Sequence, residues 1–161
     1  MFSPRAIRSM PSLSHLFYTV PGPTLGNRIM STTARICTPV TSVKTDRAYA
    51  PFAHYSQAIK AGGQVWLSGQ IPADAQGNLI KGSTVEKTKA IIQNTEAILK
   101  EAGSGLDRVV KVVVYVRDAS IMSDFASVYD PVFPHRPARS MVEVSKLPAG
   151  VEIQVDFIAV V

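Results

Sequence analysis

The stretch Val109–Val116 constrains the fold of this chain more than any other. Its residues are valines, interrupted only by Lys111 and Tyr115. β-branched side chains favour strands, because they pack well on the pleated surface of a sheet. An apolar run of this kind predicts a central strand that is covered on at least one face. The chain therefore needs a sheet, with other strands beside this one and helices against it.

The other predicted elements surround this strand. Two strand patterns precede it and are joined by Gly62-Gly63, a pair that supplies the positive φ of a hairpin turn. A long helical pattern then begins after a Ser/Thr cap and ends at Gly103. The predicted strands are residues 55–60, 64–70, 109–116, 139–144 and 151–157, and the predicted helices are about residues 84–102 and 121–129.

The second helix is predicted to be short. It begins at Ile121 and is expected to stop at about Tyr129, because Pro131 and Pro134 lack the amide hydrogen that a helix needs. The resulting order is ββαβαββ. A chain of 161 residues with 46% hydrophobic content suffices for one buried core. We therefore predict a single α/β (α+β) domain.

Charge divides the chain into two parts. Residues 1–45 hold five of the 17 basic residues and none of the 12 acidic ones, so residues 46–161 hold 12 of each and are neutral. A neutral domain lacks the field that gathers phosphates, which argues against a nucleic-acid partner. We assign residues 1–45 to a leader and linker and residues 46–161 to the folded domain.

The leader is similar to a mitochondrial presequence. It carries arginine and serine but no acid, and it lacks the long apolar run of a secretory signal. This composition predicts the mitochondrial matrix, and a disordered tail is the alternative. Met30 is a candidate internal start for a cytosolic form. The single cysteine, Cys37, lies in the leader, so the domain is expected to have no disulfide and no thiol nucleophile.

Arg139 is the candidate ligand-binding residue. Side chains alternate along a strand, so Arg139, Met141 and Glu143 share one face of the strand at 139–144. A guanidinium is a planar fork of donors that grips a carboxylate through two parallel hydrogen bonds. The alternative is an ion pair with an acid such as Glu143. The pattern favours a small carboxylate-bearing metabolite as the partner.

Motifs for a metal, a nucleotide cofactor or a membrane span are not found in the sequence. His54 and His135 have no second ligand at metal spacing, and loop positions near prolines are the simpler explanation for both. Neither a phosphate loop nor a dinucleotide fingerprint occurs. No segment approaches the roughly 18 apolar residues of a membrane span. We therefore expect chemistry without a cofactor and no membrane partner.

Three motifs together resemble the RidA family, also called the YjgF family, of reactive-intermediate deaminases. They are SGQIP at 68–72, PARSMVEV at 137–144 and LPAGVEIQV at 147–155. The resemblance covers about residues 45–161. It implies a chorismate-mutase-like fold and a homotrimer with ligand clefts between subunits. It also implies hydrolysis of enamines and imines, such as 2-aminoacrylate and 2-iminobutanoate, to 2-keto acids and ammonia.

The resemblance also assigns roles to individual residues. Arg139 matches the arginine that grips the substrate carboxylate, and Tyr55 and Ser68 match residues that line the same cleft. Gly69 and Met141 are implied to contribute backbone groups.

The chain departs from the family pattern at three places. Met141 replaces a common cysteine, and the second helix lacks about three residues, including an asparagine. Gln154 stands where active deaminases commonly have a glutamate that positions the hydrolytic water. An amide can hold that water but cannot take its proton.

Three functions remain open at this point. The first is a 2-iminobutanoate/2-iminopropanoate deaminase, which the resemblance favours. The second is a non-catalytic protein that binds small carboxylates and serves as a sensor or maintenance factor, which Gln154 and the short helix favour. The third is an endoribonuclease or translation inhibitor, and the neutral charge of residues 46–161 argues against it.

Overall fold

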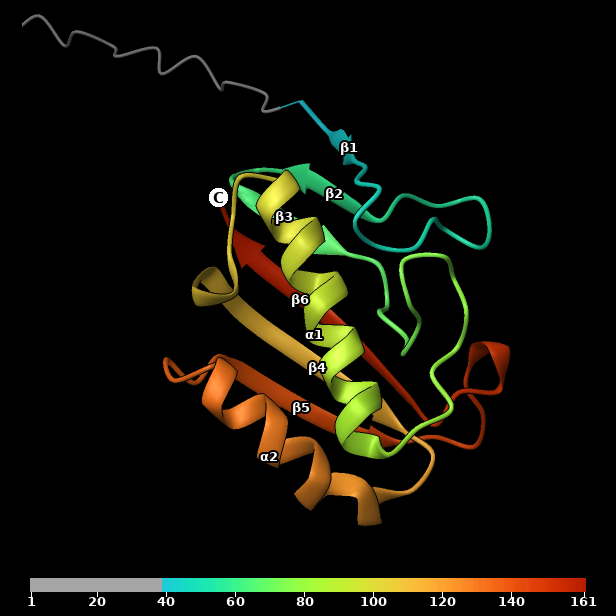
Figure 1. Cartoon of the computed structure of the whole chain (residues 1–161). Coiled ribbons are helices and arrows are strands. Elements are labelled where there is room, and N and C mark those ends of the chain that lie inside the picture. The colour runs from blue at the N-terminus through green and yellow to red at the C-terminus, as the bar shows by residue number, and fades with distance from the viewer. Residues whose placement is uncertain (1–38) are drawn as a thin grey trace, which may run out of the picture. The chain divides into compact units, whose positions relative to one another are not determined.

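The computed structural model describes residues 39–161, so Met30, Cys37 and nearly all of the predicted leader lie outside the described residues. The described chain forms a six-stranded sheet and two α-helices (Figure 1). The strands are β1 Thr41–Val43, β2 Ala58–Ala61, β3 Gln64–Leu67, β4 Val109–Val116, β5 Ala138–Glu143 and β6 Ile153–Val160. The helices are α1 Thr84–Glu101 and α2 Met122–Val132. The predicted mixed class is confirmed.

The sheet begins earlier than the sequence indicated. β1 lies within residues 1–45, the segment assigned to leader and linker, and it pairs antiparallel with β2. A strand of three residues is too short to show a periodicity. The strand order is β1-β2-β3-β6-β4-β5, and only β4 and β5 run parallel. The β2–β3 hairpin turns at Gly62 and Gly63, with φ of 57° and 76°, as predicted.

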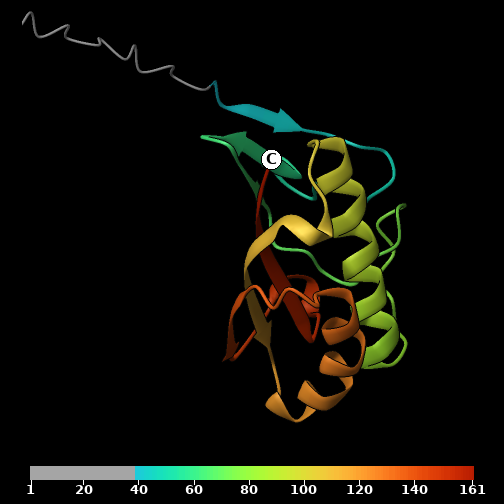
Figure 2. The same ribbon diagram turned by 90° about the vertical axis from the view of Figure 1, so that its left-hand side faces the viewer.

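Both helices cover the same face of the sheet (Figure 2). Side chains alternate between the two faces of a strand. Val112 and Val114 of β4, with Ile153 and Val155 of β6, are buried in the core on the helix side. The residues between them project from the opposite face, which we call the open face. Within residues 39–161, neither helix has the length and apolar character needed to cross a membrane.

α1 begins and ends where local signals predict. Ser83 accepts a hydrogen bond from the backbone N–H of Glu86, and the Glu86 carboxylate accepts one from the backbone N–H of Ser83, which completes a capping box. At the other end, Gly103 has φ of 78° and Ser104 donates its N–H to the carbonyl of Leu99. This is a Schellman motif, which satisfies carbonyls at the end of the helix.

α2 runs past the proline that was predicted to end it. The helix extends to Val132, with Pro131 in its last turn, so the prediction of an end at Tyr129 was wrong. Phe125, Tyr129 and Phe133 are buried, and their rings stack with centroid distances of 5.1 and 4.5 Å. Burying each ring contributes about 1.5–3 kcal/mol, which together exceeds the roughly 3 kcal/mol cost of an internal proline. Tertiary packing therefore sets the end of this helix.

Candidate functional site

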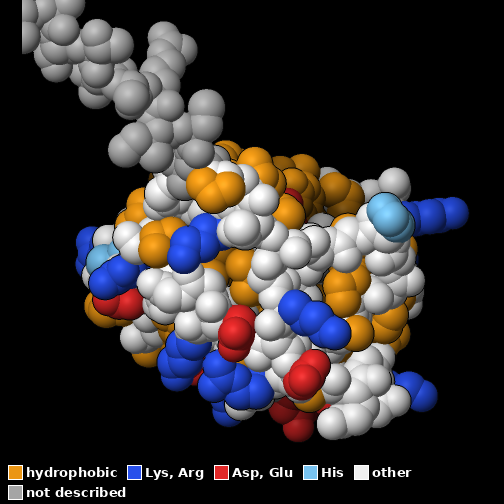
Figure 3. Space-filling view, turned by 90° about the horizontal axis from the view of Figure 1, so that it is seen from above, with side chains coloured by type: hydrophobic (Ala, Val, Ile, Leu, Met, Phe, Trp, Pro, Cys, Tyr) orange, Lys and Arg blue, Asp and Glu red, His pale blue; other side chains and the backbone are white. Residues whose placement is uncertain are grey.

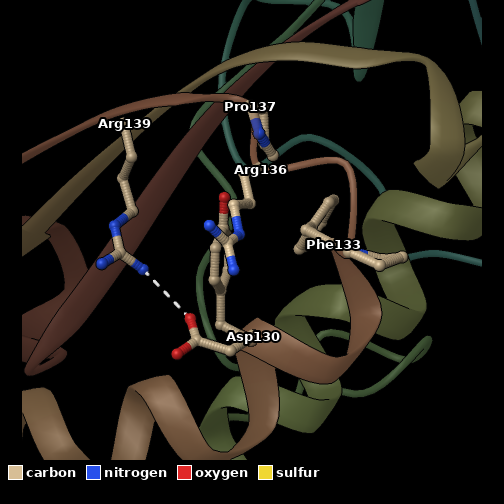
Figure 4. Close-up of a pocket in the computed structure, with 7 residues that line it drawn as sticks. Asp130, Phe133, Arg136, Pro137 and Arg139 are labelled. Carbon is tan, nitrogen blue, oxygen red and sulfur yellow. Dashed lines mark ion pairs between the residues drawn. The ribbon is translucent and has the colours of Figure 1, made fainter.

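Arg139 lies in β5, the strand at the edge of the sheet, and projects from the helix-covered face. It pairs with Val112 of β4, whose side chain is fully buried, and paired residues project from the same face. Its guanidinium carbon lies 4.9 Å from the ring centroid of Tyr129. Its Nη1 lies 3.5 Å from Oδ1 of Asp130, the ion pair drawn in Figure 4. α2 thus holds the arginine while 31% of its side chain stays exposed.

The ion pair of Arg139 differs from the alternative that the sequence suggested. Its partner is Asp130, whereas the Glu143 carboxylate accepts a hydrogen bond from the backbone N–H of Ala119 at 3.0 Å. The Asp130 side chain is 65% exposed, and ion pairs of this kind contribute only about 0–1 kcal/mol. A ligand carboxylate can therefore compete with Asp130 for the guanidinium at little cost.

Arg139 opens onto a cavity of about 690 Å³, which we call the arginine cavity. Figure 4 shows the side chains that surround it. Its lining residues are Tyr129, Asp130, Phe133, Pro134, Arg136, Pro137 and Arg139. Burial raises the pKa of Tyr129 to about 12, so its phenol stays neutral at physiological pH. Two guanidinium groups against one carboxylate give this cavity a net positive charge that suits an anion.

A second cavity of about 440 Å³ brings together four of the predicted site residues, and we call it the glutamine cavity. Tyr55 comes from the loop before β2, Ser68 and Gly69 directly follow β3, and Gln154 lies in β6. The lining residues are Tyr49, Phe52, Ala53, Tyr55, Ser68, Gly69, Ile71, Pro148, Ala149 and Gln154.

The polar groups of the glutamine cavity have defined hydrogen-bond roles. The Tyr55 hydroxyl accepts from the backbone N–H of Phe52 at 3.2 Å, which leaves its own hydrogen to donate. The Ser68 hydroxyl donates to the carbonyl of Ser56 at 2.6 Å, which leaves its oxygen to accept. Burial raises the pKa of Tyr49 to about 12. The cavity therefore offers one donor, the Tyr55 hydroxyl, and one acceptor, the Ser68 oxygen, beside the neutral ring of Tyr49.

Gly69 is needed for close packing of the cavity floor. A Cβ at this position would lie 2.6 Å from Cδ of Gln154 and 3.0 Å from Oδ1 of Asp156. The resemblance implies that Gly69 contributes a backbone group to the ligand site. In the structure, the group that occupies the space of the missing Cβ is the Gln154 side chain.

Within one chain, Arg139 and the glutamine cavity are separated. Gln154 pairs with Tyr115 and alternates with the buried Ile153 and Val155, so it projects from the open face. Arg139 projects from the opposite face. Two strand spacings and an offset of three residues separate the two positions, or about 14 Å between their Cα atoms by ideal sheet geometry. Arg139 and the predicted residues of the glutamine cavity therefore lie on opposite faces of the sheet in a single chain.

The family model for endoribonuclease L-PSP matches residues 45–161. This chain belongs to that family. The predicted relation to the RidA and YjgF proteins and the predicted chorismate-mutase-like fold are both confirmed. The mitochondrial protein Mmf1 of Saccharomyces cerevisiae is 43% identical over 124 residues, which cover 76% of this chain and 86% of Mmf1. A RutC family protein of Pyrococcus abyssi is 45% identical over 117 residues, which cover 71% of this chain and 92% of that protein.

Solved structures of the family superpose closely on this fold. The crystal structure of yeast Mmf1 matches with a TM-score of 0.74 and 42% identity, over 76% of this chain and 98% of that one. The structure of Escherichia coli TdcF with bound serine matches with a TM-score of 0.71 and 29% identity, over 75% of this chain and 98% of that one.

Met141 occupies a structural position in this RidA-family chain. Its side chain packs against the core, beside the buried Val114 with which it pairs. Among the described residues, β5 has no neighbouring strand on its outer side, so this edge leaves backbone groups open to a ligand or a partner.

His135 has its Nε2 2.9 Å from the backbone carbonyl of Val109. This contact favours a structural role for the histidine in its loop over a catalytic or metal-binding one. Residues 39–161 hold no cluster of three side chains that would suit a metal ion.

Tyr129 and Asp130, which contact Arg139, were not predicted from the sequence. One signal was available, because Phe125, Tyr129 and Phe133 recur at intervals of four and mark one face of a helix. Nothing in the sequence says that this face meets the start of β5. That contact depends on how α2 packs across the sheet.

Charged side chains do not gather into one basic surface on the face that Figure 3 shows. Lysine and arginine side chains are interspersed there with acidic and apolar ones. The view agrees with the equal numbers of acids and bases in residues 46–161.

Proposed function

We propose that this RidA-family protein hydrolyses small 2-imino and enamine acids, among them 2-iminobutanoate and 2-iminopropanoate, to 2-keto acids and ammonia. The observation that carries the proposal is the pair of half-sites on opposite faces of one sheet. The first half-site holds the cation at edge strand β5, and the second holds a polar cavity at β3 and β6. About 14 Å is too far for one small acid to contact both. A second copy of the chain would bring the two halves together.

Recognition of the substrate rests on Arg139. Its guanidinium is anchored on one side by Asp130 and Tyr129, so its orientation is set before a ligand arrives. A small acid would bind through two parallel hydrogen bonds to this group. The related TdcF binds serine, which carries the same carboxylate and α-nitrogen as 2-aminoacrylate. This likeness supports a small α-amino or α-imino acid as the ligand.

An enamine such as 2-aminoacrylate becomes the imine when its CH₂ carbon gains a proton and its nitrogen loses one. Hydrolysis of the imine then needs only a placed water molecule. The water oxygen bonds to the imine carbon while the C=N π electrons move to nitrogen, and the proton lost by the water ends on that nitrogen. The resulting carbinolamine collapses: its hydroxyl proton passes to the nitrogen, the C–N bond breaks, and ammonia leaves as the carbonyl forms. Imines hydrolyse readily, so positioning supplies much of the rate. Gln154 accepts a hydrogen bond from the water, and the Tyr55 hydroxyl donates to the substrate.

A homotrimer is the assembly that we propose for the complete site. Trp66 and Val142 are 48% and 44% exposed, and both project from the open face of the sheet. They lie on β3 and β5, so apolar side chains are exposed at both sides of this face, which favours its being covered by other chains. If other copies of the chain cover this face, ligand clefts lie between subunits, as the resemblance implies.

A protein that only binds small carboxylates is the second candidate. It is favoured by Gln154, whose amide cannot accept a proton. The family is named after an endoribonuclease, but the charge of this chain does not favour that activity. Residues 46–161 are neutral, whereas phosphate contacts draw on a basic surface.

We propose the mitochondrial matrix as the location. The acid-free leader supports it, as does the naming of yeast Mmf1 as mitochondrial. A cytosolic form that starts at Met30 remains a prediction.

The test generates 2-aminoacrylate from serine with a dehydratase in the presence of the purified protein and follows imine loss and pyruvate release. The wild type should accelerate both, and Arg139→Ala should lower kcat/KM at least about tenfold, since it removes both charge-assisted bonds. Arg108→Ala is the control, because Arg108 is exposed and lines neither cavity. A wild type that binds 2-ketobutyrate without accelerating hydrolysis indicates the binding-only protein. A wild type that does neither overturns the proposal.

A further inference from the structure

At the glutamine cavity, the amide of the lining residue Gln154 lies beside the carboxylate of Asp156. Nε2 of Gln154 donates to Oδ1 of Asp156 at 3.4 Å. The two residues are separated by the buried Val155 on β6, so both side chains project from the open face. A distance of 3.4 Å is long for a hydrogen bond to a charged group, so the amide keeps some freedom to turn.

Neighbouring strands confine this pair. Gly69 at the end of β3 lies against both side chains, with no Cβ to keep them away. From β4, the Tyr115 hydroxyl approaches the Asp156 carboxyl, whose negative charge raises the pKa of Tyr115 and keeps it a neutral donor. The charged side chain on that face of β4 is Lys111, and its ammonium donates to Oγ of Ser140 at 2.9 Å. Asp156 is therefore faced by two hydrogen-bond donors.

The charge of Asp156 decides which end of the amide meets the cavity. An ionised carboxylate only accepts hydrogen bonds, so Gln154 must turn its NH₂ group toward Asp156. Its carbonyl oxygen then points the other way. Within residues 39–161, no group donates a hydrogen bond to Oε1 of Gln154, which leaves this oxygen able to accept from a water molecule.

We propose that Asp156 is a positioning residue, which turns the Gln154 amide so that Oε1 faces the cavity and holds the hydrolytic water. The inference rests on the proposed function. The inference also explains why a glutamine can serve at position 154. Its neutral Oε1 accepts a hydrogen bond from the water, while the charge of the pair stays on Asp156. Asp156 itself acts only through Gln154.

Acid reverses this arrangement. A protonated Asp156 can donate to Oε1, so the amide turns over and presents its NH₂ group to the water. Burial raises the pKa of Asp156, and the hydrogen bonds from Gln154 and Tyr115 oppose that rise. The active orientation should therefore be lost as the pH falls through a pKa above the ordinary aspartate range.

The experiment uses substitutions that keep the size of each side chain. In full-length protein, Asp156→Asn removes the charge and lets the amide adopt either orientation. We expect kcat to fall about tenfold, as for one hydrogen bond to the reacting water, while KM for the imine stays unchanged because Arg139 binds the carboxylate. The acid limb of the kcat profile should disappear.

A spectroscopic measurement separates this inference from the proposed function. The ¹⁵N resonance of the Gln154 side-chain amide should shift with a single pKa in the wild type and should not titrate in Asp156→Asn. Asp107→Asn, an exposed acid outside both cavities, serves as the control. If Asp156→Asn keeps the wild-type kcat and its acid limb, or if the Gln154 resonance does not titrate in the wild type, the inference is wrong. If the resonance titrates but no variant hydrolyses imines, the proposed function fails and the geometry stands.

Discussion

Replacing Arg139 with lysine tests whether the residue recognises a carboxylate or only carries a charge. The side chain is held by two contacts in α2, the Tyr129 ring at 4.9 Å and the Asp130 carboxylate at 3.5 Å. A lysine ammonium can keep the attraction to both. It cannot reproduce the planar fork that fixes a ligand carboxylate by two parallel bonds.

The size of the expected effect follows from these contacts. The exposed ion pair contributes about 0–1 kcal/mol and the cation–π contact about 0.5–1 kcal/mol, and lysine retains part of each. The melting temperature should therefore barely change. Losing one charge-assisted bond to a ligand in a sheltered cleft costs about 1.5–3 kcal/mol, or roughly ten- to a hundredfold in affinity. Arg139→Lys should bind nearly as weakly as Arg139→Ala.

Calorimetric titration with 2-ketobutyrate, beside melting curves of the same samples, measures both quantities. Arg108→Lys is the matched control, since this arginine is exposed and lines neither cavity. An Arg139→Lys variant that binds like the wild type would show that Arg139 is only a surface ion-pair partner. The two-point recognition of a carboxylate would then be refuted.

The remaining predictions concern the leader, the assembly and the cavity floor. Residues 1 to about 40, fused to a reporter, should direct it to mitochondria, and a reporter that stays diffuse in the cytosol contradicts this. The wild type should be a trimer by light scattering, and Trp66→Glu should yield monomers that have lost imine hydrolysis; a monomeric wild type at micromolar concentration would end this interpretation. Gly69→Ala should lower the free energy of unfolding by about 1–3 kcal/mol in urea titrations, because its Cβ overlaps Gln154, and an unchanged midpoint would count against the packing argument. Asp156→Asn should be more stable than the wild type at neutral pH, because the raised pKa of Asp156 means that folding disfavours its charge; the gain should shrink as the pH falls through that pKa, and thermal melts across pH that show no such convergence would disprove it.

Much of the local structure was predictable from short patterns. The Gly62-Gly63 hairpin, the cap of α1 at Ser83 and the strand Val109–Val116 all depend on residues that are neighbours in the chain. β1 and the end of α2 were not predictable in this way. The first is too short to show a period, and the second depends on stacked aromatic rings that outweigh a proline.

The sequence by itself determined which residues alternate and which motifs are present. Alternation placed Arg139 and Met141 on one face of β5, and the motifs identified the family, since both are properties of consecutive residues. Only the tertiary structure decided that β5 pairs with β4 at the edge of the sheet and that both helices cover one face. Arg139 and Gln154 therefore project from opposite faces of a single chain. The physical reason is that strand pairing and helix docking join residues far apart in the chain, and period-two alternation cannot say which face becomes the covered one.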